Sequence, residues 1–468
     1  MTFDLESLLR DLCDKYGPII TIRIFSSISI FIASPSLAHQ ALIQNGAAFN
    51  YRPGPVTPSC IMDNSNPDIG SSSGNRWRFL RRNLTSEVLT PSRYKSFSHT
   101  RKWVFQTLDT LLKSHVESGE PVPVIDHFGY AMFCLLLFIC FGEKLDEKVI
   151  REIENMEREK MANYKRFAVF QFFPIFGKII FRKRWHQMHD MLRQQKSVML
   201  PLIKSRRERK EQIKQENNNR DQHFVSYIDA LFDLEIKEGG RKLSDEGVMT
   251  LISEVLDAGS DTTSTVLEWI MANLVKDQKV QEKLYSEIDG VVGKMSSITQ
   301  DNEVREEDLP KMKYLRAVIL EGLRLHPPSH YVLPHTLEED IVLNGEYLIP
   351  KNALVNFMVA TMGRDPKAWK DSMEFKPERY LGDEGEVIDI TGSKEIKIMP
   401  FSAGRRICPG LGLGLLHLEF FVANMIRNYK WVPVEGDEFD MSEKQEFTAV
   451  MKTPLRAHVF PRRRTTTN

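Results

Sequence analysis

The segment Phe401–Gly410 reads Phe-Ser-Ala-Gly-Arg-Arg-Ile-Cys-Pro-Gly and places one cysteine, Cys408, in a setting that can control its chemistry. Gly404 favours a tight turn, because glycine adopts backbone angles that are costly for other residues. Pro409 suits the first turn of a helix, and an apolar run follows over 411–426. The N–H groups and dipole of a helix start favour a negatively charged sulfur. Such a thiolate is a nucleophile or a metal ligand, although a lone cysteine is more often a buried structural residue.

A patch of small and polar residues, Ala258-Gly259-Ser260-Asp261-Thr262, lies near the middle of a predicted long helix over Ser244–Asp277. Ser244 is a good N-cap residue, and two acidic residues follow it in the first turn. Glycine, threonine and aspartate are poor helix formers. The patch therefore indicates a shelf of small residues with an acid and a hydroxyl beside it. Close packing against another helix is the alternative interpretation.

Glu321 and Arg324 form an i,i+3 pair on a strongly apolar predicted helix, Lys311–Leu325. The apolar setting suggests that the pair is buried, and a buried ion pair needs further partners to balance its desolvation. Arg379, in Pro-Glu-Arg-Tyr, is the candidate third member. An ordinary surface pair is the alternative.

Several cations have aromatic or apolar neighbours: Arg81 near Trp77, His335 after a proline, and Arg406 two residues before Cys408. Arginine suits two-pronged contacts with carboxylates. Taken singly, each of these residues is most simply a surface charge.

Composition limits the class of protein. The chain has 468 residues, of which 42% are hydrophobic and 27% charged, as in a soluble globular protein. The net charge is zero, so nothing indicates nucleic acid as a partner. Five scattered cysteines favour neither a disulfide framework nor a zinc site. The longest uncharged apolar run, Tyr130–Phe141, is too short to span a bilayer and reads as a buried helix.

The expected architecture is mainly α with a minor β part, in a single domain over residues 1–468. Isoleucine-rich runs at 19–25 and 28–32 predict a hairpin, and Asn344-Gly345 predicts a turn between two small strands. A last hairpin is expected between Phe447–Lys452 and Arg456–Phe460. The segment Asn50–Asn75 reads as a long loop.

The segment Arg166–Arg184 is crowded with aromatic and apolar residues and ends in three basic ones. Such a segment is either core or a membrane-interface element, and the sequence favours neither.

Together, these motifs resemble the cytochrome P-450 superfamily, the haem-thiolate monooxygenases. The order is small-residue helix patch, Glu-x-x-Arg, Pro-Glu-Arg-Tyr and then Phe-x-x-Gly-x-Arg-x-Cys-x-Gly, which 401–410 matches in full. The resemblance covers Lys15–Arg463 and is strongest to plant microsomal members, family 89 in particular. It implies the cytochrome P450 fold, a large helical domain plus a small β-sheet region.

The resemblance also implies a role for each motif residue. Cys408 would be the axial thiolate on the iron of haem b, iron protoporphyrin IX, with Phe401 packed on the same side. Ala258 and Gly259 would make room for O2. The positions that match those holding the haem propionates are Trp77, Arg81, His335 and Arg406. Asp261 and Thr262 would deliver protons. Glu321, Arg324 and Arg379 would lock the core around the cysteine loop.

The implied partners are a small lipophilic substrate, O2, the surface of the endoplasmic reticulum membrane on its cytosolic face, and NADPH-cytochrome P450 reductase, which supplies electrons from NADPH. Microsomal members begin with an apolar anchor and a Pro-rich hinge, and the chain is expected to start after both. By position, substrate contacts are expected from Pro55–Gly74, Phe167–Phe181, Val255, Val332-Leu333 and Thr448–Val450.

Two other functions fit the same motifs. The first is an O2-independent isomerase or dehydratase, against which the Asp261-Thr262 pair argues. The second is a haem-binding protein without catalysis, against which the complete set of motif residues argues.

Overall fold

The computed structural model describes residues 5–24, 27–54, 61, 68–167, 169–173, 175–216, 226–236, 241–299, 303–382, 388–437 and 439–462. Residues 55–60 and 62–67 of the predicted loop at 50–75 therefore lie outside the described residues. The chain divides into two compact units, and each is described by itself. The first contains residues 1–50, 105–131 and 261–468, and the second contains 51–104 and 132–260.

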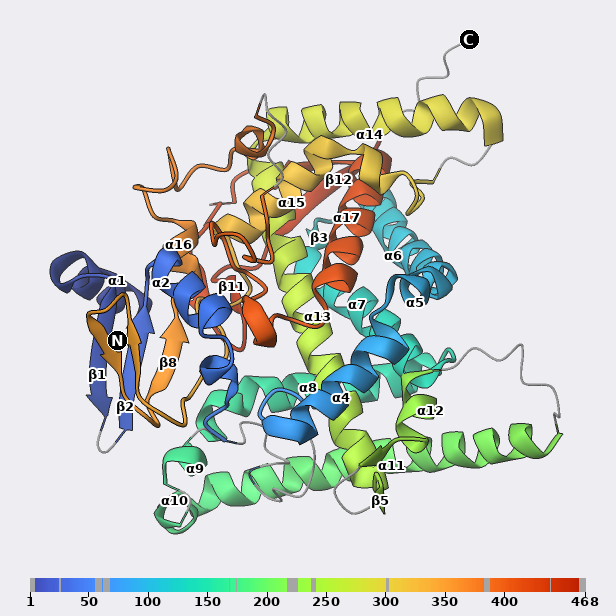
Figure 1. Ribbon diagram of the computed structural model, residues 1–468. Coiled ribbons are helices and arrows are strands. Elements are labelled where there is room, and N and C mark those ends of the chain that lie inside the picture. The colour runs from blue at the N-terminus through green and yellow to red at the C-terminus, as the bar shows by residue number, and fades with distance from the viewer. Residues whose placement is uncertain are drawn as a thin grey trace. The chain divides into compact units, whose positions relative to one another are not determined.

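The main sheet of the first unit begins with the predicted hairpin, which is confirmed. Strand β1 (Ile19–Ile24) pairs antiparallel with β2 (Ser27–Ile32), and β8 (Leu354–Phe357) lies parallel to β2 on its other side (Figure 1). The predicted turn at Asn344-Gly345 is also confirmed, between β6 (Ile341–Leu343) and β7 (Tyr347–Ile349). Both turn residues have positive φ, 52° and 70°, as a tight hairpin of this kind requires.

The predicted C-terminal hairpin is wrong. Strand β11 (Ala449–Met451) pairs with β10 (Glu443–Gln445), whereas β12 (Arg456–Pro461) pairs with β9 (Tyr429–Pro433) and β3 (Val122–Pro123). Strand β11 thus pairs with the strand just before it in the chain, and β12 pairs with strands much earlier in the chain. The turn around Pro454 separates two sheets instead of closing one.

The first unit also contains a set of helices. They are α1 (Leu5–Tyr16), α2 (Pro35–His39), the π-helix η1 (Gln40–Gln44), the short helices η2 (Ala48–Asn50), η3 (Leu309–Lys311), η4 (Pro377–Tyr380) and η5 (Gly404–Arg406), α14 (Gln278–Thr299), α15 (Lys313–Leu325), α16 (Val359–Gly363) and α17 (Leu411–Asn428). Helix α17 confirms the apolar helix predicted after Pro409.

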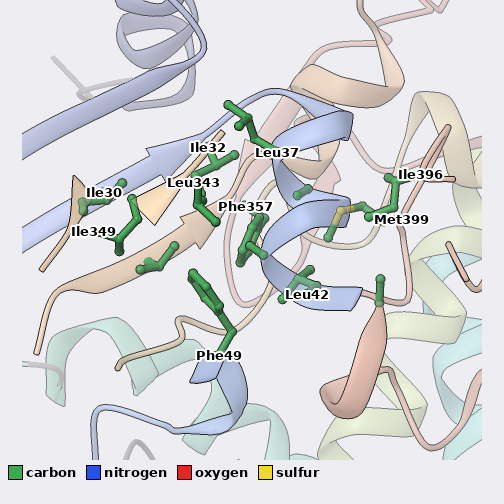
Figure 2. Packing of buried hydrophobic residues seen from close by; sticks show 14 of the residues in the cluster. Ile30, Ile32, Leu37, Leu42, Phe49, Leu343, Ile349, Phe357, Ile396 and Met399 are labelled. Atoms are coloured by element: carbon green, nitrogen blue, oxygen red, sulfur yellow. The ribbon is translucent and has the colours of Figure 1, made fainter. Parts of the chain in front are cut away.

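A buried apolar cluster joins the main sheet to the cysteine segment. Phe357 of β8 packs with Leu42 of η1 and with Phe49 of η2, while Met399 and Ala403 enter the same cluster from the chain that leads to Cys408 (Figure 2). Burial of such side chains contributes about 1.5–3 kcal/mol each. The cysteine segment is therefore supported by the core of the sheet.

The second unit is almost wholly helical in its described part. Its elements are α4 (Gly74–Val88), α5 (Pro91–Ser96), α8 (Glu147–Phe167), α9 (Val169–Phe172), α10 (Phe176–Ile180), α11 (Arg182–Glu216), α12 (Tyr227–Phe232), β4 (Glu235–Ile236) and β5 (Arg241–Lys242). The core interpretation of Arg166–Arg184 holds for only part of the segment. Phe167 and Phe170 are buried with Met188, whereas Ile175, Phe176, Ile179 and Ile180 are about 70% exposed.

Three helices run from one unit into the other: α6 (Ser98–Ser118), α7 (Val124–Phe141) and α13 (Asp245–Lys276). Helix α13 confirms the long helix predicted over Ser244–Asp277, and the Gly247 N–H donates to the Ser244 hydroxyl at 3.1 Å. Among the described residues, α7 alone is long and apolar enough to cross a bilayer, and 78% of it is buried. Its apolarity therefore fits the predicted buried helix.

Candidate functional site

The loop that carries Cys408 is closed by its own backbone. The Cys408 N–H donates to the Phe401 carbonyl at 2.8 Å, and the Ile407 N–H donates to the Gly404 carbonyl at 3.1 Å. Gly404 has a φ of +70°, and a Cβ on it would lie 2.0 Å from the Leu42 carbonyl oxygen. Both its conformation and its close approach to η1 therefore require glycine.

Two further glycines leave space around the sulfur and the aromatic ring of the loop. A Cβ on Gly410 would lie 3.8 Å from the Cys408 sulfur, and one on Gly414 would lie 3.6 Å from the Phe401 ring. Cys408 is half-buried and forms no disulfide. A single accessible thiol, held just before α17 and bordered by glycines, fits the thiolate ligand of a haem iron.

His335 and Arg406 both bind the segment that ends η2. His335 Nδ1 donates to the Phe49 carbonyl at 2.5 Å, and Arg406 Nε donates to the Asn50 carbonyl at 2.8 Å. Both side chains are buried. The structure thus brings two of the four predicted propionate ligands to one short segment of the first unit.

Trp77 and Arg81, the other two, lie one turn apart on α4 in the second unit. Trp77 is buried and Arg81 is half-buried. The structure therefore places these two predicted propionate ligands on the same helix.

The Glu321–Arg324 pair is fully buried, and Arg379 joins it. Arg324 donates through Nε and Nη2 to both carboxylate oxygens of Glu321, each at 2.8 Å, and Arg379 Nε donates to the same carboxylate at 3.0 Å. Arg324 Nη1 also donates to the carbonyls of Gly363 and Ser372 at 2.7 Å. The cluster binds the end of α15 to the chain that follows α16.

The small-residue patch of α13 has two different faces. A Cβ on Gly259 would lie 2.7 Å from a methyl group of Leu136 on α7, so Gly259 allows the close helix packing that was the alternative interpretation. Ala258 is exposed, and Asp261 and Thr262 are half-buried. The Ser260 hydroxyl is already used, because it donates to the Leu256 carbonyl at 2.6 Å.

Sequence reasoning missed the residues that fix the Thr448–Val450 segment. Thr265 and Thr448 share a hydroxyl hydrogen bond at 2.9 Å, and Trp269 Nε1 donates to the Ala449 carbonyl at 2.7 Å. Trp269 also stacks on His326, with ring centroids 4.0 Å apart. The two hydrogen bonds join positions 183 and 180 residues apart, so no local pattern signals them.

A second missed cluster holds the neighbouring strand β10. His326 Nδ1 and His330 Nε2 contact the two carboxylate oxygens of Glu443 at 3.0 and 2.7 Å, and Arg364 binds the same carboxylate. Burial alone would raise the pKa of Glu443, but these hydrogen bonds and the Arg364 charge hold that pKa well below its usual range. The Glu443 carboxylate is therefore ionised at neutral pH and fixes β10 through these contacts.

Comparison with known proteins agrees with these features. The Cytochrome P450 family model matches residues 4–460. The chain is 45% identical over 472 residues to Cytochrome P450 89A9 of Arabidopsis thaliana, covering 98% of this chain and 90% of that protein. It is 30% identical to Flavonoid 3'-monooxygenase of the same plant, covering 97% and 87%. A solved zebrafish cytochrome P450 with abiraterone superimposes with a TM-score of 0.76 at 19% identity, covering 98% of this chain and all of that one.

The chain belongs to the cytochrome P450 family. The predicted resemblance to this family, and to family 89 within it, is confirmed, and so is the mainly α fold with a minor β part. The protein is accordingly a haem-dependent monooxygenase, an oxidoreductase that uses O2, an organic substrate and a redox partner.

Proposed function

We propose that residues 1–468 form one catalytic domain that inserts one oxygen atom from O2 into a small lipophilic substrate. The electrons come from NADPH through NADPH-cytochrome P450 reductase. The substrate gains a hydroxyl, the second oxygen atom leaves as water, and NADPH is oxidised to NADP⁺ with uptake of one proton. The observation that carries this proposal is the closed Cys408 loop, in which a half-buried thiol is bordered by glycines.

Cys408 is assigned as the iron ligand of haem b. Bound through this thiolate, haem supplies the redox chemistry that activates O2. Phe401 packs against α17 at Gly414 and keeps the sulfur side of the site apolar. His335 and Arg406, together with Trp77 and Arg81, are assigned to the haem carboxylates, because their side chains carry N–H donors that suit such partners.

Asp261 and Thr262 are assigned to proton delivery. Half-buried side chains on adjacent helix positions can accept a proton from water and pass it to a reacting oxygen atom. Ala258, which is exposed, and Gly259 leave room beside them. Glu321, Arg324 and Arg379 have a structural role, since their cluster satisfies the buried charges and fixes the chain around α16.

The substrate is assigned to the lipophilic class because the candidate contact positions are largely apolar. They include Val255, Val332, Leu333 and the segment Thr448–Val450. Two hydrogen bonds from α13 fix that last segment: one from the Thr265 hydroxyl and one from the Trp269 indole. Rigid apolar walls with few polar groups are typical of sites for such ligands.

The exposed face of α10 is assigned to the membrane of the endoplasmic reticulum, on its cytosolic side. Ile175, Phe176, Ile179 and Ile180 are 68–71% exposed, and basic residues at 178 and 182–184 surround them. Apolar side chains edged by cations favour the interface of an anionic bilayer. Ile179→Asp should weaken binding to vesicles that contain phosphatidylserine, whereas the same change at exposed Leu348 in β7 should not.

The reduced, carbon-monoxide-bound absorption spectrum tests the thiolate assignment. The purified protein should give the red-shifted Soret band of a thiolate-ligated haem, and Cys408→Ser should abolish it. Cys13→Ser, which changes another half-buried cysteine, should leave the band intact. Well-folded wild-type protein that gives no such band would exclude the proposal.

Turnover assays separate monooxygenation from the isomerase or dehydratase alternative. Product formation should require NADPH, the reductase and O2 together, and turnover without the reductase would favour the alternative. Thr262→Ala should keep the Soret band but consume NADPH with less product. Thr250→Ala, which removes a hydroxyl bonded to the Glu246 carbonyl on the same helix, should leave that ratio unchanged.

A further inference from the structure

Glu254 of α13 binds the backbone of the segment that leads into α4. Its carboxyl oxygens accept hydrogen bonds from two consecutive amides, Ile69 N–H at 2.8 Å and Gly70 N–H at 2.7 Å. These contacts span 185 and 184 residues of sequence and lie within the second unit. One side chain thus fixes two successive peptide groups.

The segment 68–73 also makes hydrogen bonds through its own side chains. Asp68, which is 1% exposed, accepts hydrogen bonds from the Ser71 N–H at 2.7 Å and from the Ser71 hydroxyl at 2.5 Å. The Ser73 hydroxyl accepts the Arg52 N–H at 3.1 Å. Among these described contacts, only those of Glu254 connect the segment to α13.

Burial, and next the nearby charge of Asp68, raise the pKa of Glu254 to about 8, although the two amides and Lys160 act in the opposite direction. The carboxyl group is therefore mostly neutral at pH 7. Other titratable groups near this cluster are Tyr164 and Tyr227. A glutamine at 254 would keep the neutral charge but replace one oxygen acceptor by a donor, in conflict with an amide N–H.

Glu254 lies one helical turn before Ala258, so the two side chains share a face of α13. Ala258 is exposed, and the proposed function assigns it to the space next to the reacting oxygen. Glu254 thus ties the amides of Ile69 and Gly70 to α13 at a position one turn before Ala258.

We propose that Glu254 is a positioning residue that determines ligand selectivity by holding Ile69 and Gly70 beside the Ala258 turn. The inference rests on the proposed function, because it concerns the ligand site of the same monooxygenase. Loss of the carboxyl group releases the Ile69 and Gly70 amides from α13, and the discrimination between small and bulky ligands changes.

Amide hydrogen exchange tests the contact without any need for haem. In Glu254→Gln the protection of Ile69 and Gly70 should fall roughly tenfold, as expected for loss of one buried hydrogen bond and creation of a donor–donor conflict. Glu254→Ala, which loses both bonds, should show a larger fall. The matched control is Glu246→Gln on the same helix, which removes a half-exposed ion pair with Lys196 and should leave both amides protected.

Two iron-binding probes of different size, imidazole and 4-phenylimidazole, test selectivity. Their dissociation constants come from the shift of the haem absorption band in the full-length protein. The ratio of the two constants should change roughly tenfold in Glu254→Ala, less in Glu254→Gln, and not at all in Glu246→Gln. A residue with only a structural role would change both constants together and leave their ratio constant.

Three results would overturn the inference: unchanged protection at Ile69 and Gly70 in Glu254→Ala, loss of protection along the whole of α13, or a constant ratio of ligand affinities. Failure of the proposed function gives a different result. Wild-type protein would then lack the thiolate Soret band, while the exchange measurement on Ile69 and Gly70 would still report on the contact.

Discussion

His335 and Arg406 donate hydrogen bonds to neighbouring carbonyls, those of Phe49 and Asn50, although 71 residues separate the two side chains in the sequence. Because a carbonyl can only accept, the proton on Nδ1 of His335 is assigned by this contact. Nε2 can then donate to a carboxylate only if the ring is also protonated there. The segment 49–50 therefore orients the His335 and Arg406 side chains together.

Arg406→Lys should lower haem retention although it keeps the positive charge. Lysine carries its donors on one nitrogen and lacks the guanidinium fork, whose separate nitrogens let arginine bind the Asn50 carbonyl through Nε and a carboxylate through another nitrogen. We expect the haem-to-protein ratio, measured from the haem absorption of purified protein, to fall severalfold. Arg405→Lys changes the exposed neighbour and should retain the wild-type ratio. Equal haem content in Arg406→Lys and wild type would contradict the assignment.

Gly404→Ala should disrupt the cysteine loop. An alanine would be forced into the left-handed region at a cost of about 1–2 kcal/mol, and its Cβ would in addition clash with the Leu42 carbonyl. We expect a lower thermal midpoint and loss of the thiolate Soret band. Gly436 is the matched control, since its φ is +83° but a Cβ there would meet nothing within 4 Å. Gly436→Ala should show the modest backbone cost alone and keep the band.

Arg324→Met should destabilise the protein by about 3–5 kcal/mol, because Glu321 would remain buried with only part of its compensation. The measurement is the free energy of unfolding in urea. Lys283→Met breaks the exposed pair with Glu378 and should cost less than about 1 kcal/mol. Similar losses in the two variants would argue that the Glu321 cluster is not a stability determinant.

A helix start and a turn that depend on neighbouring residues were predicted correctly from the sequence. Ser244 marked the start of α13, and the positive φ values of Asn344 and Gly345 explain why that dipeptide marked a turn. The C-terminal hairpin was predicted wrongly because strand pairing depends on partners far along the chain. No turn residue near Pro454 indicates that β12 pairs with β9 and β3.

Site residues could be predicted where their signal lies in neighbouring residues of the sequence. Cys408 lies in a dense motif whose spacing can be read directly, whereas Glu254 is an acidic residue on a helix whose partners are backbone amides. Backbone amides have no sequence signature. Gly259 shows the intermediate case: its small size was visible, but the reason for it, Leu136 on α7, was not.

Glu268 should make the free energy of unfolding fall as pH rises, whereas a salt-bridged acid makes it rise. Burial raises its pKa to about 7, although the Leu455 N–H, donated to its carboxyl at 2.9 Å, acts to lower that pKa. In the unfolded chain the group loses its proton near pH 4.3. Between these values the folded state holds a proton that the unfolded state releases, so stability falls as pH rises, by about 1–3 kcal/mol from pH 5 to pH 8.

Glu268→Gln removes this dependence, because glutamine is neutral at every pH and can still accept the Leu455 N–H. The difference in unfolding free energy between the variant and the wild type, measured in urea, should therefore move in favour of the variant as pH rises from 5 to 8. Glu338→Gln, at an exposed position, should show no such trend. A pH-independent difference for Glu268→Gln would mean that the carboxyl group is already ionised in the folded protein at pH 5, and that the desolvation argument fails at this site.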